Sequence, residues 1–326
     1  MPRALITGIG GFVGPYLAAL LHSHAIDCVG ISQKTQAHDH PVGLVDTPVH
    51  EIDLRDRGGV EELVAREKPD LVFHLAAMSH VATSRTDPVT TFDTNVGGTL
   101  NLLEAVRRRN SGCRVLFVST GNMYGDIESP NEGFSESDPV HPGSPYASSK
   151  FIGEQLARCY YEDFGVEVVI ARPFNHTGPG QSPSFACPEF ARAIAEGVVH
   201  RTGIHLRTGP LEPHRDISDV RDVVRAYALL AERGKPGEVY NVCSGSMVQM
   251  ESIVARLAAI AGVSVTTELD PAKLRRREIL YSGGNPARIR SDLGWAPRIS
   301  LERTLTDLLE YWVDRLSRAD KAGSAN

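Results

Sequence analysis

A tyrosine and a lysine near the middle of the chain have types and a spacing that suit proton transfer. Tyr146 and Lys150 stand four residues apart in a segment with helical character, so both side chains lie on one face of that helix. A phenol, with a pKa of roughly 10, is a poor acid or base at neutral pH, and a nearby ammonium group lowers that pKa by stabilising the phenolate. We therefore predict that Tyr146 exchanges a proton with a carbonyl or alcohol oxygen of a substrate.

A hydroxyl at the end of a predicted strand joins this pair. Thr120 follows the predicted strand 114–119, and ligands of open α/β sheets bind at the carboxyl ends of the strands. Its hydroxyl can hydrogen-bond the substrate oxygen that Tyr146 protonates. As isolated residues, Tyr146 and Lys150 would more often be a surface pair on a helix, but the set of three predicts catalysis.

A glycine-rich segment near the amino terminus predicts a phosphate site. Gly8, Gly11 and Gly14 enclose Phe12 and Val13 between a short apolar run and a helical pattern. Glycine adopts positive φ and carries no Cβ, so the backbone can approach a pyrophosphate, and the following helix presents N–H donors and the positive end of its dipole. The alternative is a purely structural turn, but the strand-to-helix context favours a dinucleotide cofactor.

The end of the second predicted strand indicates which dinucleotide binds. An acidic residue there usually holds the ribose 2′-hydroxyl of NAD, whereas a 2′-phosphate needs cations. The residues at this point are Ser32, Gln33 and Lys34, with no carboxylate. They favour NADP(H), with NAD(H) as the alternative, and Lys34 could equally be a solvated loop lysine.

The elements that must position these residues alternate between strands and helices. Predicted strands cover 4–7, 28–32, 71–75, 114–119 and 167–172, and predicted helices cover 14–24, 59–67, 89–108 and 145–164. This alternation is typical of a parallel sheet with helices on both faces. We predict an α/β fold with a doubly wound parallel Rossmann sheet.

The pattern changes after Arg172, where a smaller α/β substrate-binding domain is expected. A segment rich in Pro, Gly and Ser, 173–188, predicts a long loop. Helices are predicted at 189–197, 219–233, 250–261 and 301–317, and a strand at 238–242. We assign 1–172 and 215–245 to the dinucleotide-binding domain, 173–214 and 246–317 to the substrate domain, and 318–326 to a flexible tail.

Composition excludes several classes of protein. The 326 residues carry a formal net charge of -6, which argues against a nucleic-acid partner. We find no signal-peptide pattern and no apolar run of the length that spans a bilayer, so no membrane partner is expected. Five widely spaced cysteines suggest reduced thiols in a cytoplasmic protein, and the twelve histidines show no metal-ligand pattern, so no metal is expected.

Taken together, these residues resemble the extended short-chain dehydrogenase/reductase superfamily over nearly the whole chain. The resemblance includes the glycine trio, Thr120, Tyr146 and Lys150, and further the segments 53–54, 74–77, Asn95 and 172–175. It implies that Asp53 and Leu54 border the adenine and that Leu75, Ala76 and Ala77 border the cofactor ribose. It also implies that Asn95 and Pro173 belong to the cofactor site.

The later half of the chain looks like the GDP-4-keto-6-deoxy-mannose reductases, in the segments 172–181, 214–222, 239–245, 274–278 and 294–297. The resemblance implies NADPH-dependent reduction of the C4 keto group of a GDP-linked 4-keto-6-deoxyhexose, giving GDP-6-deoxymannose (GDP-rhamnose). Arg215, Arg275 and Asn175 match residues that contact the diphosphate, Glu278 is a further substrate residue, and Arg207 is placed near the base pocket. It also implies a homodimer, and the surfaces we expect to pair are 89–108 and 145–164.

One position separates this reductase activity from the related dehydratases. The dehydratases that the chain resembles use an acidic residue where this sequence has Asn122, and a neutral amide cannot act as a general acid or base. Asn122 is therefore expected to contact substrate without moving a proton. The alternatives are a GDP-mannose 4,6-dehydratase or C4-epimerase, and a catalytically silent nucleotide-binding protein. We expect His74 to be a hydrogen-bonded core residue, and His176 to contact the substrate.

Overall fold

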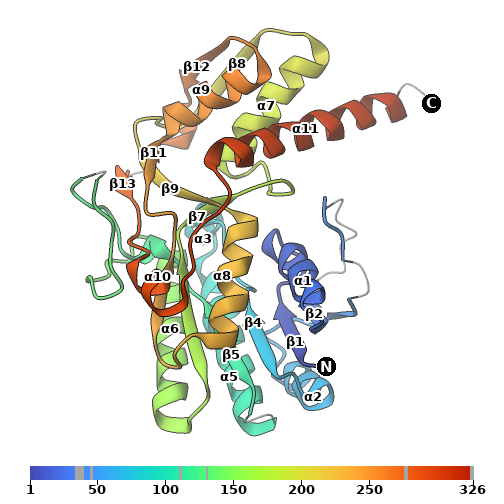
Figure 1. Cartoon of the computed structure of the whole chain (residues 1–326), viewed down its shortest axis with the longest axis vertical. Helices are drawn as coiled ribbons and strands as arrows, with labels where there is room; N and C mark the ends of the chain where they lie inside the picture. The colour runs from blue at the N-terminus through green and yellow to red at the C-terminus, as the bar shows by residue number, and fades with distance from the viewer. Residues whose placement is uncertain (34–39, 45–46, 110–111, 130, 275–277, 324–326) are drawn as a thin grey trace.

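A parallel sheet of seven strands forms the centre of the larger part of the molecule (Figure 1). The computed structural model describes residues 1–33, 40–44, 47–109, 112–129, 131–274 and 278–323. The sheet has the order β10-β6-β5-β4-β1-β2-β3, and every neighbouring pair is parallel. Its strands are β1 (Arg3–Thr7), β2 (Asp27–Ser32), β3 (Val49–Glu51), β4 (Leu71–His74), β5 (Arg114–Val118), β6 (Val168–Pro173) and β10 (Val239–Val242). The doubly wound Rossmann fold predicted from the sequence is confirmed.

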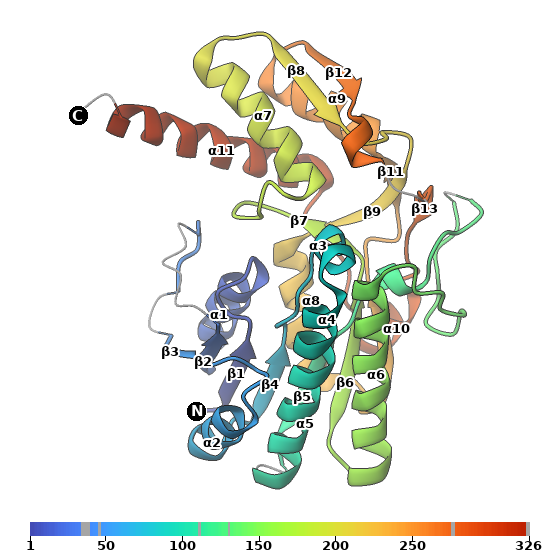
Figure 2. The same cartoon turned by 180° about the vertical axis from the view of Figure 1, so that it is seen from behind.

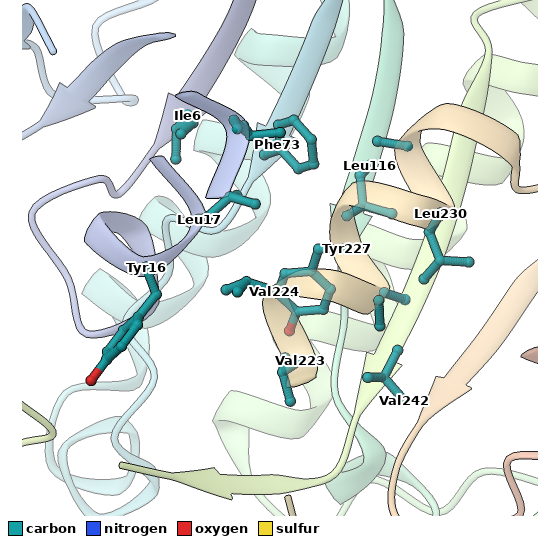
Figure 3. Packing of buried hydrophobic residues seen from close by; sticks show 14 of the residues in the cluster. Ile6, Tyr16, Leu17, Phe73, Leu116, Val223, Val224, Tyr227, Leu230 and Val242 are labelled. Carbon is teal, nitrogen blue, oxygen red and sulfur yellow. The ribbon is translucent and has the colours of Figure 1, made fainter. Parts of the chain in front are cut away.

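Helices cover both faces of this sheet. The helices α1 (Val13–Ser23), α8 (Val220–Arg233) and α10 (Ala287–Leu293) pack on one face. Figure 3 shows Leu17 of α1 and Val224 and Tyr227 of α8 among the apolar side chains of this layer. The opposite face carries α2 (Arg57–Glu67), α5 (Gly98–Arg109) and α6 (Pro145–Phe164), seen from behind in Figure 2. Both faces of the sheet are apolar because helices cover each of them, so that the strand side chains on either side are buried.

The long helix predicted at 89–108 contains a local irregularity. It consists of α4 (Pro88–Phe92), a π-helical segment η1 (Asp93–Gly97) and α5, preceded by the short α3 (Val81–Thr86). The wider π-turn inserts one residue into the helical repeat, a device common at functional sites. Asn95 lies within this segment, with its side chain buried.

A second layer of structure stands above the carboxyl ends of the strands. Its core joins α7 (Ala186–His200), α9 (Met250–Ala261) and α11 (Leu301–Gly323) through side chains such as Phe190, Leu257 and Leu308. Two small sheets accompany them: β8 (Ile204–Thr208) with β12 (Val265–Leu269), and β9 (His214–Asp219) with β7 (Asn175–Thr177), β11 (Met247–Gln249) and β13 (Tyr281–Ser282). Short 3-10 turns η2 (Gly121–Met123) and η3 (Pro271–Lys273) complete the elements.

Two expectations for this second layer were wrong. The segment 173–188 is not one long loop, because it contains β7 and the first turn of α7, whose apolar residues pack into the core of the layer. The last helix does not end at residue 317 but continues to Gly323, so the tail predicted from residue 318 is helical for its first six residues. None of the helices in the described ranges combines the length and apolar character needed to cross a membrane.

Two acidic residues at the start of α8 form hydrogen bonds that connect the two layers. The carboxylate of Asp222 accepts hydrogen bonds from the backbone N–H groups of Arg298 (2.9 Å) and Ile299 (2.8 Å), just before α11. The Asp219 carboxylate accepts one from the hydroxyl of Thr304 in α11 at 2.8 Å. Both carboxylates are fully or almost fully buried. They therefore fix where α11, and with it the second layer, stands over the sheet.

Candidate active site

A cleft of about 1720 Å³ separates the sheet from the second layer. Its walls come from the segments that follow β1, β2, β4, β5 and β6, and on the other side from α7, β9 and η3. The carboxyl ends of parallel strands are where open α/β sheets bind ligands. The cleft therefore occupies the expected place for cofactor and substrate.

The glycine-rich turn after β1 forms one end of the cleft. Gly8 has a φ of +72°, and a Cβ there would lie 2.8 Å from Cα of Ala76. A Cβ on Gly14 would lie 2.1 Å from the carbonyl oxygen of Ile9, so α1 can begin this close to the turn only with glycine. Gly11, Phe12 and Val13 line the cleft between them, and the first turn of α1 carries no acidic residue. The backbone and the helix dipole at this end suit a pyrophosphate.

The segment after β4 is held by buried polar side chains. The Asn95 side-chain oxygen accepts a hydrogen bond from the backbone N–H of Met78 (2.7 Å), and its amide donates to the hydroxyl of Ser149 (2.9 Å). Asn95 does not itself line the cleft, but it fixes the backbone beside Leu75, Ala76 and Ala77, which do. Asn95 is thus placed to position the cofactor wall rather than to contact the cofactor.

His74, at the end of β4, is the hydrogen-bonded core residue that was predicted. One ring nitrogen is 2.8 Å from the hydroxyl of Thr7 and the other 2.8 Å from the hydroxyl of Thr99. Burial, together with the smaller effect of the positive charge of Lys150, lowers the pKa of His74 to about 3. The imidazole is therefore neutral and structural at physiological pH.

The end of β2 presents hydroxyl and amide groups to the cleft. Ser32 and Gln33 line it, as do Ile52 and Leu54. Asp53 does not, because its carboxylate is held by the guanidinium of Arg55 at 2.6 Å, and this pairing lowers the pKa of Asp53 to about 2. Lys34 lies outside the described residues.

The three predicted catalytic residues meet in the middle of the cleft. Tyr146 and Lys150 come from the first two turns of α6, whose amino terminus is capped by Ser144, and Thr120 follows β5. The Thr120 hydroxyl lies close enough to the phenol of Tyr146 to lower its pKa, against the effect of burial. All three side chains are largely buried, with at most 9% exposed. Such a site exchanges protons with a bound substrate rather than with bulk water.

The electrostatics of the pair differ from the expectation. Burial raises the pKa of Tyr146, and the group that opposes this shift is the Thr120 hydroxyl rather than Lys150. The Lys150 ammonium lies 4.6 Å from the centre of the Phe117 ring, and burial lowers its pKa to about 7. Removal from water penalises the charged form of both groups, and here it outweighs their mutual attraction.

A buried ionic network below this pair was not anticipated from the sequence. Glu154, fully buried one turn after Lys150, binds the guanidinium of Arg172 at 2.6 Å and accepts a hydrogen bond from Ser119 at 3.0 Å. Arg172 donates in turn to the hydroxyl of Tyr124 at 2.6 Å. Glu154 also raises the pKa of Lys150, although less than burial lowers it. The i, i+4 spacing of Lys150 and Glu154 is the signal in the sequence that could have identified it.

The predicted substrate residues divide into three groups. Asn122, Asn175, Arg215 and Glu278 line the cleft, as does His176, whose ring stacks on Phe12 with centroids 6.1 Å apart. Arg215 donates to the carbonyl oxygen of Ile279 (2.8 Å) and to Glu278 (3.3 Å). Arg207 does not line the cleft, because its exposed side chain on β8 pairs with Asp270 at 3.6 Å. Arg275 lies outside the described residues.

The fold and the cleft define an extended short-chain dehydrogenase/reductase, an NAD(P)-dependent enzyme of nucleotide sugars. A model of the GDP-mannose 4,6-dehydratase family matches residues 5–308. The chain is 36% identical over 314 residues to the GDP-6-deoxy-D-mannose reductase of Pseudomonas aeruginosa, covering 96% of this chain and 98% of that protein. The chain belongs to the GDP-mannose 4,6-dehydratase family.

Solved structures agree with this assignment. The structure of RMD from Pseudomonas aeruginosa complexed with NADPH superposes with a TM-score of 0.84 at 34% identity, covering 97% of this chain and all of that one. The UDP-glucose 4-epimerase of Thermotoga maritima with UDP-glucose superposes with a TM-score of 0.87 at 27% identity, covering 96% of this chain and 99% of that one. Relatives with one fold therefore use different nucleotides and reactions, so the activity of this chain must be argued from its site.

Proposed function

We propose that this enzyme reduces the C4 keto group of GDP-4-keto-6-deoxy-D-mannose with NADPH, producing GDP-6-deoxymannose (GDP-rhamnose). Its similarity to the Pseudomonas reductase extends over almost the full length of both proteins. The catalytic residues and the basic side chain of Arg215 line one cleft, as a nucleotide-sugar reductase requires. A reductase needs a hydride donor and one proton donor, and Tyr146 supplies the proton.

The observation that carries the proposal is the neutral side chain of Asn122 beside the catalytic residues. Its backbone N–H donates to the Thr120 hydroxyl at 3.2 Å, and it lines the cleft. Among the described residues lining the cleft, the acidic ones are Asp126, Glu189 and Glu278, which bind Tyr281 N–H, Lys273 and Arg215 respectively. Dehydration of the sugar needs a further acid or base close to the substrate. The site therefore supports the alternative activities, 4,6-dehydration or epimerisation, less well than reduction.

Each catalytic side chain has a distinct task in this proposal. When bound, the nicotinamide supplies the hydride. Thr120 orients the keto oxygen through its hydroxyl, and Tyr146 donates a proton to the oxygen as negative charge develops there. Lys150 stabilises the resulting phenolate and hydrogen-bonds the ribose. Arg215 places a permanent positive charge in the cleft wall, which suits the diphosphate.

The preference for NADPH rests on the end of β2. Ser32 and Gln33 line the cleft there and carry no negative charge. An acidic side chain at this point would repel a 2′-phosphate, whereas hydroxyl and amide groups can donate hydrogen bonds to it. Lys34 remains the predicted cationic partner, and NAD(H) remains the alternative cofactor.

The test is a direct assay with two substrates. Purified enzyme is incubated with NADPH and GDP-4-keto-6-deoxymannose while nicotinamide absorbance is followed, and the product is identified by NMR. We expect one NADPH consumed per reduced sugar. If NADPH is stable but GDP-mannose is converted to a keto sugar, the enzyme is a dehydratase in spite of Asn122.

We further propose a homodimer and a cytoplasmic location. Val89 of α4 is 70% exposed, Leu100 of α5 42% and Ile152 of α6 39%, on helices that lie side by side in Figure 2. Pairing with the same helices of a second copy would bury these side chains. Light scattering should give twice the chain mass, and Val89→Lys should shift it toward the monomer. The cytoplasmic location rests on the five cysteines, all of them free thiols.

A further inference from the structure

An ion pair stands in the cleft wall on the side of the second layer, away from the glycine-rich turn. Glu189, in the first turn of α7, binds the ammonium group of Lys273 at the end of η3. Both residues line the cleft, and their side chains are 38% and 34% exposed. The catalytic steps proposed above use neither of them.

The ion pair is held in place but keeps capacity for a ligand. The Lys273 ammonium donates to the carboxylate oxygen Oε1 of Glu189 and, at 2.6 Å, to the carbonyl oxygen of Arg207. An ammonium group has three N–H donors, so two are used by these acceptors. Within the described chain, one donor of Lys273, the Oε2 oxygen of Glu189 and the second acceptor site of its Oε1 oxygen can meet a ligand. The helix dipole of α7 favours the negative charge at this position.

Apolar side chains beside the pair form walls suited to a flat ring. Phe190, which follows Glu189 in α7, lines the cleft, as do Pro210, Pro213 and Met250; Gly209, which precedes Pro210, lies beside Lys273. Leu274, next to Lys273, also lines the cleft. Mostly apolar walls with a few convergent polar groups are typical of ligand pockets.

The position along the cleft indicates which part of the substrate lies here. The cofactor turn follows β1, and Thr120 follows β5, which is two strands away from β1 in the sheet. Arg215, the group suited to the diphosphate, lies on β9, which pairs with β7 after β6. A nucleotide sugar whose keto group reaches Tyr146 must extend past Arg215 with its nucleoside. Residues of α7 and η3 then surround the base.

The chemistry of the pair matches guanine. The N1–H and N2–H groups of guanine are adjacent donors that one carboxylate can accept side by side, and the neighbouring O6 accepts from an ammonium group. Uracil and thymine instead present a single N–H group that lies between two carbonyl oxygens. A carboxylate that approaches this N–H group is repelled by both carbonyl oxygens. Relatives with this fold include an enzyme of UDP-glucose, so the base must be distinguished by residues such as these.

We propose that Glu189 and Lys273 select guanine, with the Glu189 carboxylate accepting from N1–H and N2–H and the Lys273 ammonium donating to O6. The inference rests on the proposed function, because it places the nucleoside of that substrate. The two side chains thus act as specificity determinants, not as catalytic residues.

The experiment is calorimetric titration of the full-length enzyme with GDP, IDP and UDP. IDP lacks only the N2 amino group, so the wild type should bind it several-fold more weakly than GDP, and UDP more weakly still. Glu189→Gln should lower the affinity for GDP by about tenfold or more and the affinity for IDP by a smaller factor. Its affinity for UDP should equal that of the wild type. Lys273→Met should lower the affinities for GDP and IDP by the same factor, because both bases carry O6.

A matched control lies on the same helix. Glu196 of α7 forms an ion pair with Arg192 at 2.9 Å and does not line the cleft, so Glu196→Gln should alter no affinity. Equal binding of GDP and IDP by the wild type overturns the inference even if a variant fails to fold. Equal weakening of GDP and UDP by Glu189→Gln also overturns it, as a structural ion pair would give that result. Binding of none of the three nucleotides would reject the proposed function as well.

Discussion

The guanidinium of Arg172 and the carboxylate of Glu154 form a buried ion pair directly below the catalytic residues, with Nη2 and Oε1 2.6 Å apart. The side chain of Glu154 is fully buried and that of Arg172 is 5% exposed. Ser119, which donates to Glu154, precedes Thr120 in the chain, and Glu154 follows Lys150 by one helical turn. The pair therefore connects β5, β6 and α6 at the point where all three supply the active site.

Glu154→Gln should destabilise the enzyme and shift its pH profile. Loss of one partner leaves the Arg172 charge buried without compensation, which costs about 3–5 kcal/mol of unfolding free energy. Glu154 also raises the pKa of Lys150, so its removal should lower that pKa further below about 7. Because the protonated ammonium is the active form, activity should fall at a lower pH than in the wild type.

Urea unfolding measures the loss of unfolding free energy, and kcat measured as a function of pH shows the shift of the pH profile. Glu162→Gln, an exposed position near the end of the same helix, is the control and should change neither. An unchanged pH profile in Glu154→Gln would mean that this carboxylate does not tune Lys150.

Tyr146→Phe should remove the proton donor and keep the binding site. The Phe side chain retains the buried ring and loses the hydroxyl that would donate the proton. We expect kcat to fall by about 10²–10⁴-fold, the usual contribution of a positioned acid, with NADPH affinity within a few-fold of the wild type. Stopped assays and fluorescence titration measure the two quantities, and Tyr161→Phe on the exposed face of α6 is the control. Normal turnover by Tyr146→Phe would assign the proton to another group.

Gly8→Ala should impair the cofactor site, and Gly43→Ala is its matched control. Both glycines have positive φ, +72° and +68°, so both substitutions carry the left-handed strain of about 1–2 kcal/mol. At Gly8 the new Cβ would meet backbone, 2.8 Å from Cα of Ala76, whereas at Gly43 it would meet no atom of the described residues within 4 Å. Gly8→Ala should therefore lose roughly 1–3 kcal/mol more unfolding free energy and most of its NADPH affinity. Equal effects of the two substitutions would contradict the close approach.

Replacement of His74 should reduce the dependence of the free energy of unfolding on pH on the acid side. The pKa of His74 is about 3 in the folded protein and about 6.5 for an exposed histidine. Between these values the unfolded chain binds a proton that the folded protein does not, so the free energy of unfolding rises with pH, by up to about 1.4 kcal/mol per unit.

Urea unfolding between pH 4.5 and 7 should show this slope reduced in His74→Asn, whatever the overall loss of stability. His24→Asn, at an exposed position, should keep the wild-type slope. A variant of His74 with an unchanged slope would show that the buried imidazole is not responsible.

Local chemistry determined much of this protein from its sequence. Glycine spacing between an apolar run and a helix requires a tight turn wherever it occurs, so Gly8, Gly11 and Gly14 could be assigned to a phosphate site without coordinates. Strands alternating with helices allow few arrangements other than a doubly wound parallel sheet. The boundaries of α6 and α9 were predicted to the residue. A capping serine, a proline and a glycine mark the ends of α6, and a glycine marks the carboxyl end of α9.

Tertiary structure alone decided the surroundings of those residues. The phenol of Tyr146 and the ammonium of Lys150 have the right spacing for mutual stabilisation, yet burial controls both pKa values, because desolvation depends on elements distant in the chain. Likewise, the side chain of Arg207 pairs with Asp270 and does not line the cleft, whereas Glu189 and Lys273, 84 residues apart, meet in its wall. The sequence determines which groups exist and their local spacing, but packing decides which distant groups meet and how much water surrounds them.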